Sequence, residues 1–327
     1  MTKKKKIKTI GLVTPGGDAP GMNTAIRAVV RTAIYHKLKV YGISKGWHGL
    51  ITGQIDEMNI KSVSGIINKG STILGSHRTK EFRDKNMRQV AYKNLKERFI
   101  DALIVIGGDG SLRAANVVSK ETDLPVIHIP ASIDNDISCT DYTIGFDTAV
   151  NTAVDAIDKI RDTASAFNRV FVVEVMGKRK GLLAVEVGLV CGAEAIVIPE
   201  VKFNLSEIAK RIKDGQRRGK ASFIIVLAEG VMSAEKFAEK LRNKVKKVDV
   251  KISVLGHMQR GGSPTAISRE LACKMGARAV ECLLNGCHNI MIGGKSEELV
   301  ETPFAKVIRT KMKVDLRHIK LAEMLAI

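Results

Sequence analysis

Residues 102–111 read ALIVIGGDGS, an apolar run that passes directly into a glycine-rich turn with one carboxylate. The run is typical of a buried strand. The turn is typical of a phosphate site, because glycines without a Cβ atom let backbone N–H groups approach phosphate oxygens. A helix beginning at Ser111 would direct its positive N-terminal end to the same place, and Asp109 could hold a metal ion that phosphate also binds. Taken alone, such a sequence is more often a plain turn.

Two further segments follow the same plan and favour the phosphate site. Residues 10–23 read IGLVTPGGDAPGMN and residues 126–136 read VIHIPASIDND, so each apolar run ends in a loop with glycine or acidic residues. In a parallel sheet, ligands bind outside the carboxyl ends of the strands. We therefore expect the three loops to converge on one nucleotide-phosphate site.

The length and composition indicate a globular protein. The chain has 327 residues, 45% of them hydrophobic, which is enough for two α/β domains. The longest apolar runs, such as residues 223–228, are far shorter than the roughly 20 residues that span a bilayer, so no membrane partner is expected. The basic start, residues 1–6, leads into a strand-like run without the features of a signal peptide. We expect a cytoplasmic protein.

The cysteines are scattered, with no Cys-x-x-Cys pair and no histidine at zinc-site spacing. Free thiols in a reducing compartment explain them best, and Cys191 is expected in an apolar helix as a small buried hydrophobe. The five are Cys139, Cys191, Cys273, Cys282 and Cys287.

The formal net charge of +19 is the most unusual bulk property. Nucleic acid is the obvious partner for such a charge, but the basic residues are dispersed, aromatic residues make up only 4%, and no nucleic-acid-binding motif is present. A positive field also speeds the arrival of small polyanions. Phosphorylated metabolites are therefore the favoured ligands, and no nucleic-acid partner is expected.

Strand-like and helix-like patterns alternate along the chain, which predicts a doubly wound α/β fold with largely parallel sheets. We expect the main break near residues 142–146. Helical periodicity covers residues 24–36, 86–98, 148–167, 205–219, 234–245 and 268–285. Strand patterns cover residues 10–13, 40–43, 102–106, 126–129, 170–175, 195–198, 222–227, 251–255 and 289–292.

Two nucleotide motifs of other families are disfavoured. Residues 294–296 read GKS and imitate the end of a P-loop, but the required earlier glycine would fall at Asn289, so we expect a surface turn. No Gly-x-Gly-x-x-Gly fingerprint is found, which disfavours a nicotinamide enzyme.

Five motifs in order carry a resemblance to a known family. They are GGDAPGMN (16–23), GGDGS (107–111), SIDND (132–136), VMG (175–177) and LGHMQRGGSP (255–264). With them the chain closely resembles the bacterial ATP-dependent 6-phosphofructokinases over nearly its whole length. The resemblance implies two Rossmann-like doubly wound domains. Residues 1–144 plus about 257–306 would bind the nucleotide, and about 145–256 plus 307–327 would bind the sugar phosphate.

The resemblance also implies the catalytic roles. Phosphoryl transfer needs an in-line nucleophile, a proton acceptor and charge neutralisation. Asp134 matches the base for the sugar 1-hydroxyl, and Asp109 and Asp136 match the carboxylates that position Mg²⁺. Arg78 matches the arginine that bridges the phosphates of both substrates. Ser132 stands where the family usually has threonine, and its hydroxyl is expected to contact the transferred group.

The ATP contacts follow from the same resemblance. Trp47 matches an adenine-contacting aromatic, although simple packing explains a single tryptophan equally well. Ala114 and Lys178 replace a glycine and an arginine of the family near the nucleotide, which affects the expected fit of adenosine. The implied ATP contacts are Gly17, Trp47, Arg78, Gly108, Asp109, Gly110 and Ser111.

The sugar phosphate site is implied in the same way. His257 and Arg260 together could hold a phosphate, although His257 without its motif reads as a surface or capping histidine. Lys251 replaces an arginine of the family. The two parallel hydrogen bonds that a guanidinium offers to phosphate are thereby replaced by one compact charge. Arg169 is expected to enter from a neighbouring subunit, which implies a homotetramer. The fructose 6-phosphate contacts implied are Ser132, Asp134, Asp136, Arg169, Met176, Gly177, Glu229, Lys251, His257 and Arg260.

An effector pocket matches only in part, because Ile60 stands where the family has arginine. ADP or phosphoenolpyruvate would be the effector, and ordinary surface charge is the alternative explanation of these cations. The matching residues are Arg27, Arg31, Arg161, Glu194, Arg218 and Lys220.

The resemblance implies transfer of a phosphoryl group from MgATP to fructose 6-phosphate, giving fructose 1,6-bisphosphate. A pyrophosphate-dependent enzyme is the first alternative, and Gly110 and Ala131 argue against it because that branch has bulkier residues there. A catalytically weak regulatory subunit is the second. The changes at Lys178, Lys251, Ser132 and Ala114 suggest it, whereas the intact Asp109, Asp134, Asp136 and Arg78 favour an active enzyme.

Overall fold

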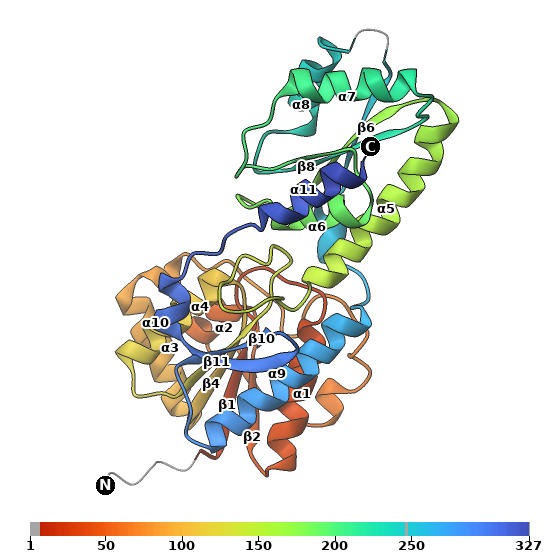
Figure 1. The fold of residues 1–327 in the computed structure, drawn as a ribbon. Coiled ribbons are helices and arrows are strands. Elements are labelled where there is room, and N and C mark those ends of the chain that lie inside the picture. Colours follow the sequence, from red (N-terminus) through yellow and green to blue (C-terminus); the bar gives the residue numbers. More distant parts are fainter. Residues whose placement is uncertain (1–6, 246–247, 327) are drawn as a thin grey trace. The chain divides into compact units, whose positions relative to one another are not determined.

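The computed structural model describes residues 7–245 and 248–326, so the basic start at residues 1–6 lies outside the described part. The chain divides into two compact units (Figure 1). Unit 1 contains the described residues up to Thr148 together with Arg260–Met312, and unit 2 contains Ala149–Gln259 and the residues from Lys313 onward. The chain leaves unit 1 near the start of helix α5 (Phe146–Ala166) and re-enters it in the short helix η3 (Gly256–Arg260). It leaves unit 1 again after Met312, and all three crossings lie a few residues beyond the expected ones.

The described residues of unit 1 form a seven-stranded sheet in the order β11-β10-β5-β4-β1-β2-β3. The five inner strands are parallel, and the two edge strands, β3 and β11, pair antiparallel with their neighbours. This order confirms the predicted doubly wound arrangement. The strands are β1 (Thr9–Val13), β2 (Lys39–Ile43), β3 (Ile55–Met58), β4 (Ala102–Gly107), β5 (Val126–Pro130), β10 (Ile290–Lys295) and β11 (Glu298–Pro303).

Helices cover both faces of this sheet. Helices α1 (Met22–Tyr35) and α9 (Ala266–Leu284) pack closely on one face, and a Cβ atom at Gly276 would lie 2.6 Å from Ala28 Cβ. The other face carries the larger apolar core, where Leu103 and Val105 of the sheet meet Leu112. The helices that supply this core are α2 (Gly46–Thr52), α3 (Lys85–Glu97), α4 (Asp109–Glu121) and α10 (Phe304–Arg309), with η1 (Lys61–Val63) and η2 (Glu81–Arg83) in the connections.

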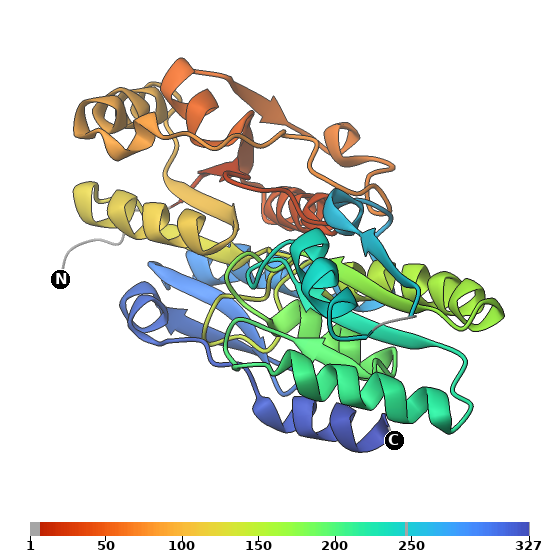
Figure 2. The same ribbon diagram turned by 90° about the horizontal axis from the view of Figure 1, so that it is seen from above.

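Unit 2 contains a second, smaller sheet. Its described residues form four parallel strands in the order β7-β8-β6-β9. Phe237, Ile212 and Ile225 belong to its apolar core, and α11 packs against α6 (Figure 1; Figure 2 shows the same ribbon from above). The strands are β6 (Val170–Val175), β7 (Ala195–Val197), β8 (Phe223–Ala228) and β9 (Val250–Val254). The remaining helices are α6 (Leu182–Val190), α7 (Leu205–Arg217), α8 (Ala234–Arg242) and α11 (Leu316–Leu325).

The helices and strands read from periodicity are all present, with their ends displaced by at most a few residues. The GKS sequence forms a turn only in part: Gly294 and Lys295 are the last residues of β10, and Ser296 with Glu297 joins β10 to β11 with positive φ angles of 49° and 70°. Cys191 is a correction: it is the C-cap residue of α6 and is only partly buried. Within the described part, no helix is long and apolar enough to cross a membrane.

Candidate active site

The three predicted loops meet at the carboxyl edge of the unit 1 sheet. Ser111, after β4, donates its hydroxyl to the carbonyl of Pro15, after β1, at 2.8 Å. The amide of Ala131, after β5, donates to the carbonyl of Gly107 at 3.0 Å. These bonds join the ends of three neighbouring strands, which confirms the expected convergence.

The turn after β4 is shaped for close backbone approach. A Cβ atom at Gly107 would lie 2.5 Å from Ser111 Oγ and 2.9 Å from the Pro15 carbonyl oxygen, so only glycine fits there. Helix α4 begins at Asp109, two residues earlier than expected, with Gly108 as its N-cap. A Cβ atom at Gly110 would meet nothing within 4 Å. The turn therefore offers a helix N-terminus that opens onto free space.

Asp134 is buried in the loop that follows β5, with 1% of its surface exposed. Its backbone amide donates to Ser132 Oγ at 3.2 Å, and this hydroxyl lies 3.5 Å from carboxylate oxygens of both Asp134 and Asp136. The Cβ of Ser132 is 3.9 Å from the position of a Cβ on Gly108. The loop thus places Ser132, with Asp134 and Asp136 around it, beside the glycine turn.

Asn135 and Thr143 hold this loop in shape, and neither was assigned a role from the sequence. Asn135 has a positive φ of 49°; its amide nitrogen donates to the Asp141 carbonyl at 2.8 Å and its oxygen accepts from the Thr143 amide at 2.8 Å. The Thr143 hydroxyl donates to the Ser132 carbonyl. The available signal for Asn135 was its place between the two aspartates of the motif.

The carboxylates at this edge suit the implied Mg²⁺. Within the described residues, no three or more His, Cys, Asp and Glu side chains gather as a metal site. Mg²⁺ does not need such a cluster, because it usually takes one or two carboxylates and fills its shell with water and substrate phosphate oxygens. Asp109 pairs with Arg113 at 2.8 Å, a contact that raises the pKa of Arg113, yet the Asp109 side chain remains 39% exposed. The oxygen donors present therefore fit the ion.

Arg260, the last residue of η3, packs against the turn that follows β1. Its Nη1 donates to the Asp18 carbonyl at 3.0 Å and is 3.8 Å from the Asp18 carboxylate. A Cβ atom at Gly17 would lie 2.8 Å from the same nitrogen, so glycine leaves room for the guanidinium. Arg78 is exposed in the loop before η2.

Trp47 is 5% exposed and stacks on Phe82, with ring centroids 4.4 Å apart and an angle of 14° between the planes. Both rings belong to the large core of unit 1. This packing accounts for the tryptophan without a nucleotide.

In unit 2, Glu229 organises the turn after β6. Its Oε1 accepts hydrogen bonds from the amides of Gly177 at 3.1 Å and Lys178 at 2.6 Å. Gln259, which the sequence reasoning missed, accepts from the Met176 amide at 2.9 Å. The structure therefore brings together Met176, Gly177 and Glu229, as the resemblance implied. His257 is exposed in η3 and belongs to unit 2, whereas Arg260 belongs to unit 1.

Asp249 joins the two remaining cations of the implied sugar phosphate site. Its carboxylate is 2.7 Å from Arg169 Nε and 3.0 Å from Lys251 Nζ. Hydrogen bonds from Lys251 and then Arg169 lower the pKa of Asp249. Arg169 also covers the ring of Phe167 at 4.2 Å. A phosphate would therefore compete with Asp249, a residue without any sequence signal, for both cations.

Comparison with known proteins decides the family. A model described as phosphofructokinase matches residues 9–283. The chain belongs to the phosphofructokinase family. It is 50% identical to the ATP-dependent 6-phosphofructokinase of Clostridioides difficile and 48% identical to that of Thermoanaerobacter pseudethanolicus, in both cases over 98% of this chain and 100% of the relative.

Solved structures of phosphofructokinases have the same fold. The Pichia pastoris phosphofructokinase in the T-state matches with a TM-score of 0.88 and 33% identity, over 94% of this chain and 36% of that longer one. A pyrophosphate-dependent phosphofructokinase from Marinobacter aquaeolei matches with a TM-score of 0.84 and 23% identity, over 95% and 86% of the two chains. The second likeness concerns the fold alone.

Four of the six residues that the resemblance implied for an effector pocket, Arg161, Glu194, Arg218 and Lys220, belong to unit 2. Glu194 is 4% exposed; its carboxylate is 3.3 Å from Arg161 Nη1 and 3.0 Å from Lys220 Nζ, and it accepts from the Ile224 amide. A cavity of about 510 Å³ adjoins it, lined by Arg218 and Lys220 and by the additional cations Arg211 and Arg217. Arg27 and Arg31 lie on α1 in unit 1.

Proposed function

We propose that this chain transfers the γ-phosphoryl group of MgATP to the 1-hydroxyl of fructose 6-phosphate, giving fructose 1,6-bisphosphate and ADP. The observation that carries the proposal is the buried Asp134, which lies in one loop with Ser132 and beside the glycine turn at Gly108. Family membership and the names of the bacterial relatives support it. Unit 1 would bind the nucleotide and unit 2 most of the sugar phosphate.

Asp134 is the proposed proton acceptor. The 1-hydroxyl must lose a proton as it attacks phosphorus, and a carboxylate within hydrogen-bond reach can take it. Ser132 Oγ, adjacent to Asp134, would donate to an oxygen of the moving group. Arg78, exposed before η2, would offer forked donors to phosphate oxygens of both substrates.

Asp109 and Asp136 would hold Mg²⁺, and Gly108, Gly110 and the start of α4 would receive the ATP phosphates through backbone N–H groups. When bound, the ion supplies charge neutralisation on the phosphate oxygens. Asp109 would exchange its contact with Arg113 for this role. The open space at Gly110 supports a nucleotide, and thus ATP, over pyrophosphate.

Glu229 and Met176 would line the sugar, and His257, Arg260, Lys251 and Arg169 would neutralise its 6-phosphate. We place Arg169 and Lys251 in a site completed by a second copy of the chain, in a homotetramer. The cationic cavity beside Glu194 would take a phosphorylated effector such as ADP or phosphoenolpyruvate. A cytoplasmic location, where both substrates occur, agrees with the free thiols.

The proposal is tested by a coupled assay of purified protein with fructose 6-phosphate and ATP, GTP or pyrophosphate. ATP should support turnover, and pyrophosphate should not. Asp134→Ala should lower kcat by about 10²–10⁴-fold, because the proton acceptor is lost, while substrate binding changes much less. Turnover with pyrophosphate alone would overturn the donor assignment, and a kcat of Asp134→Ala within a few-fold of the parent would remove Asp134 from its role.

A further inference from the structure

The loop that carries Arg78 depends on other elements for its shape. Residues 67–78, called here the Arg78 loop, are all described and form neither helix nor strand. Such a segment has no repeating backbone bonds to fix it, so its contacts with the surrounding unit decide where Arg78 lies. These contacts come from the turn between β1 and α1, from the first residues of α1, and from Lys45 and Ser263.

Asn23, in the first turn of α1, makes the central contacts. Its side chain is buried, with 2% of the residue exposed. Its amide nitrogen donates to the carbonyls of Lys69 at 3.1 Å and Gly70 at 2.9 Å, and its oxygen accepts from the Ile73 amide at 2.7 Å. Both N–H donors of the Asn23 side chain and one of its acceptor positions thus form hydrogen bonds with this loop.

Neighbouring residues form further hydrogen bonds with the part of the loop nearer to Arg78. Thr14 Oγ1 donates to the Gly75 carbonyl at 2.9 Å, and the Gly16 amide donates to the His77 carbonyl at 3.3 Å. On the other side, a Cβ atom at Gly70 would lie 2.4 Å from the Gly262 carbonyl oxygen. The Arg78 loop is therefore held between the turn that carries Gly17 and the segment that follows Arg260.

We infer that Asn23 is a positioning residue of the phosphoryl-transfer reaction, acting through the Arg78 loop on Arg78. The inference rests on the proposed role of Arg78. A guanidinium stabilises a transferring group only when it is held close to the productive geometry, and small displacements are costly. Asn23 holds the loop from the first turn of α1, directly after the segment that carries Gly17, an implied ATP contact, so it ties the arginine to the phosphate site.

Asn23→Ala should lower kcat about 10–100-fold with little change in the KM for either substrate, because the defect lies in transition-state alignment. The test is a double-mutant cycle of Asn23→Ala and Arg78→Ala. If Asn23 acts through Arg78, the asparagine substitution should cost little once the arginine is absent. Hydrogen exchange at the Ile73 amide should also accelerate in Asn23→Ala.

Thr24→Val is the matched control. Thr24 is equally buried on α1, and its Oγ1 donates at 2.8 Å to the carbonyl of Ile67, at the far end of the loop from Arg78. The Thr24→Val variant should lose about as much stability as Asn23→Ala but keep the kcat of the parent protein. If Asn23→Ala does not fold, Asn23→Asp keeps the acceptor for the Ile73 amide and removes only the two donors.

The outcomes separate the inference from the proposed function. If Arg78→Ala leaves kcat unchanged, the proposed role of Arg78 fails and the inference fails with it. The second outcome is that Arg78→Ala lowers kcat, but the fold-losses of kcat caused by the two single substitutions multiply fully in the double variant. In that case Asn23 does not act through Arg78, and the proposed function stands. A loss of kcat in Thr24→Val equal to that in Asn23→Ala would also overturn the inference, because it would reduce the effect to general stability.

Discussion

His128 lies on β5 in the middle of the unit 1 sheet, with none of its surface exposed. Neither ring nitrogen has a hydrogen-bond partner among the described residues. Burial lowers the pKa of His128 to about 3. The backbone carbonyls of Gly107 and Gly108 oppose this lowering of the pKa, although neither accepts a hydrogen bond from the ring. The imidazole is therefore neutral in the folded protein and carries an uncompensated cost of burial.

Replacement of His128 by leucine should stabilise unit 1 at pH 7 by about 1–3 kcal/mol, because it removes buried polar atoms without partners. The pKa is depressed on folding, so below its ordinary value of 6.5 the unfolded chain binds a proton that the folded chain refuses, and the wild type loses stability as the pH falls from 6.5 toward about 3. The advantage of His128→Leu should therefore widen from pH 7 to pH 5. Thermal unfolding at both pH values checks this, and a lower Tm for the variant at pH 7 would mean that the imidazole has a partner such as a buried water.

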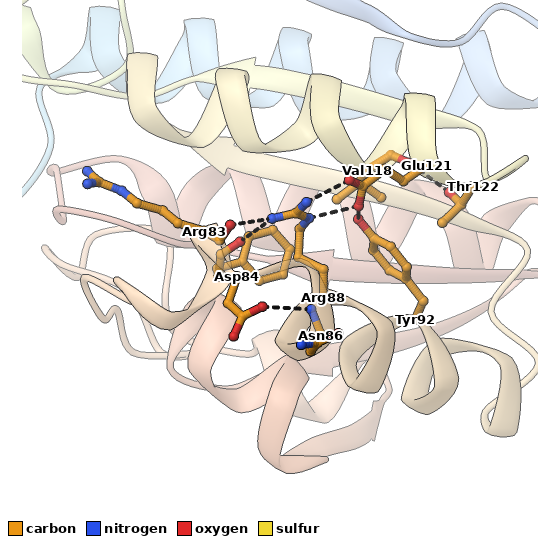
Figure 3. Close-up of polar contacts among 9 residues, drawn as sticks. Arg83, Asp84, Asn86, Arg88, Tyr92, Val118, Glu121 and Thr122 are labelled. Atoms are coloured by element: carbon orange, nitrogen blue, oxygen red, sulfur yellow. Dashed lines mark hydrogen bonds and ion pairs between the residues drawn. The ribbon is translucent and has the colours of Figure 1, made fainter.

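At the scale of elements, an ion-pair network joins α3 to α4 on the core-covered face (Figure 3). Arg88 forms a fork with Glu121, with contacts of 2.7 Å and 2.6 Å, and Tyr92 donates its hydroxyl to Glu121 at 2.8 Å. Arg88 also donates to the carbonyls of Phe82 and Arg83. The network ties both helices to the connection before α3. The hydrogen bonds from Arg88 are the main cause that lowers the pKa of Glu121 to about 2.

Glu121→Gln should lower the stability of the protein by about 1–3 kcal/mol at pH 7, because a charge-assisted fork is lost and Arg88 remains half-satisfied. The carboxyl has a lowered pKa on folding, so its contribution is present above 4.5 and disappears as the pH falls toward about 2. The gap between variant and wild type should narrow from pH 7 to pH 3. Thermal unfolding measures it.

Glu97→Gln is the control for this prediction. Glu97 pairs with Lys93 on the same helix, but the two side chains are 58% and 74% exposed, and such pairs contribute little. An effect of Glu97→Gln as large as that of Glu121→Gln would contradict the account of the fork between Arg88 and Glu121.

At the scale of the whole molecule, the assembly should decide the affinity for the sugar phosphate. Lys251 and Arg169 share Asp249, and the proposed tetramer would present these cations to a neighbouring subunit. Lysine is a compact point charge, whereas arginine offers parallel donors to phosphate. Lys251→Arg should therefore lower the KM for fructose 6-phosphate several-fold, with little change in the KM for ATP.

Steady-state kinetics on protein verified as tetrameric by light scattering checks this expectation. Lys236→Arg, an exposed lysine on α8, is the control and should leave both KM values unchanged. An unchanged or raised KM for the sugar phosphate in Lys251→Arg would mean that the surroundings of Asp249 have adapted to lysine.

Local sequence determined the strands of both sheets and the loops that bear the chemistry. An apolar run followed by glycine or aspartate specifies a buried strand and its turn from neighbouring residues alone, and parallel pairing then places the turns at Gly107, Pro15 and Ala131 together. The edge strands β3 and β11 were not predicted from the sequence. Their exposed sides carry acidic residues, so they lack the apolar pattern of a buried strand.

Tertiary structure alone decided the contacts between residues far apart in the chain. Asn23 reaches the Arg78 loop, Asp249 reaches Arg169, and Trp47 stacks on Phe82, although no periodicity or motif spacing relates the members of these pairs. The physical reason is that hydrogen bonds and ring contacts of this kind form only after the sheets have assembled and brought distant backbone within a few ångströms. The sequence by itself therefore determined which loops carry the chemistry, and the packing within each unit decided which side chains hold those loops in place.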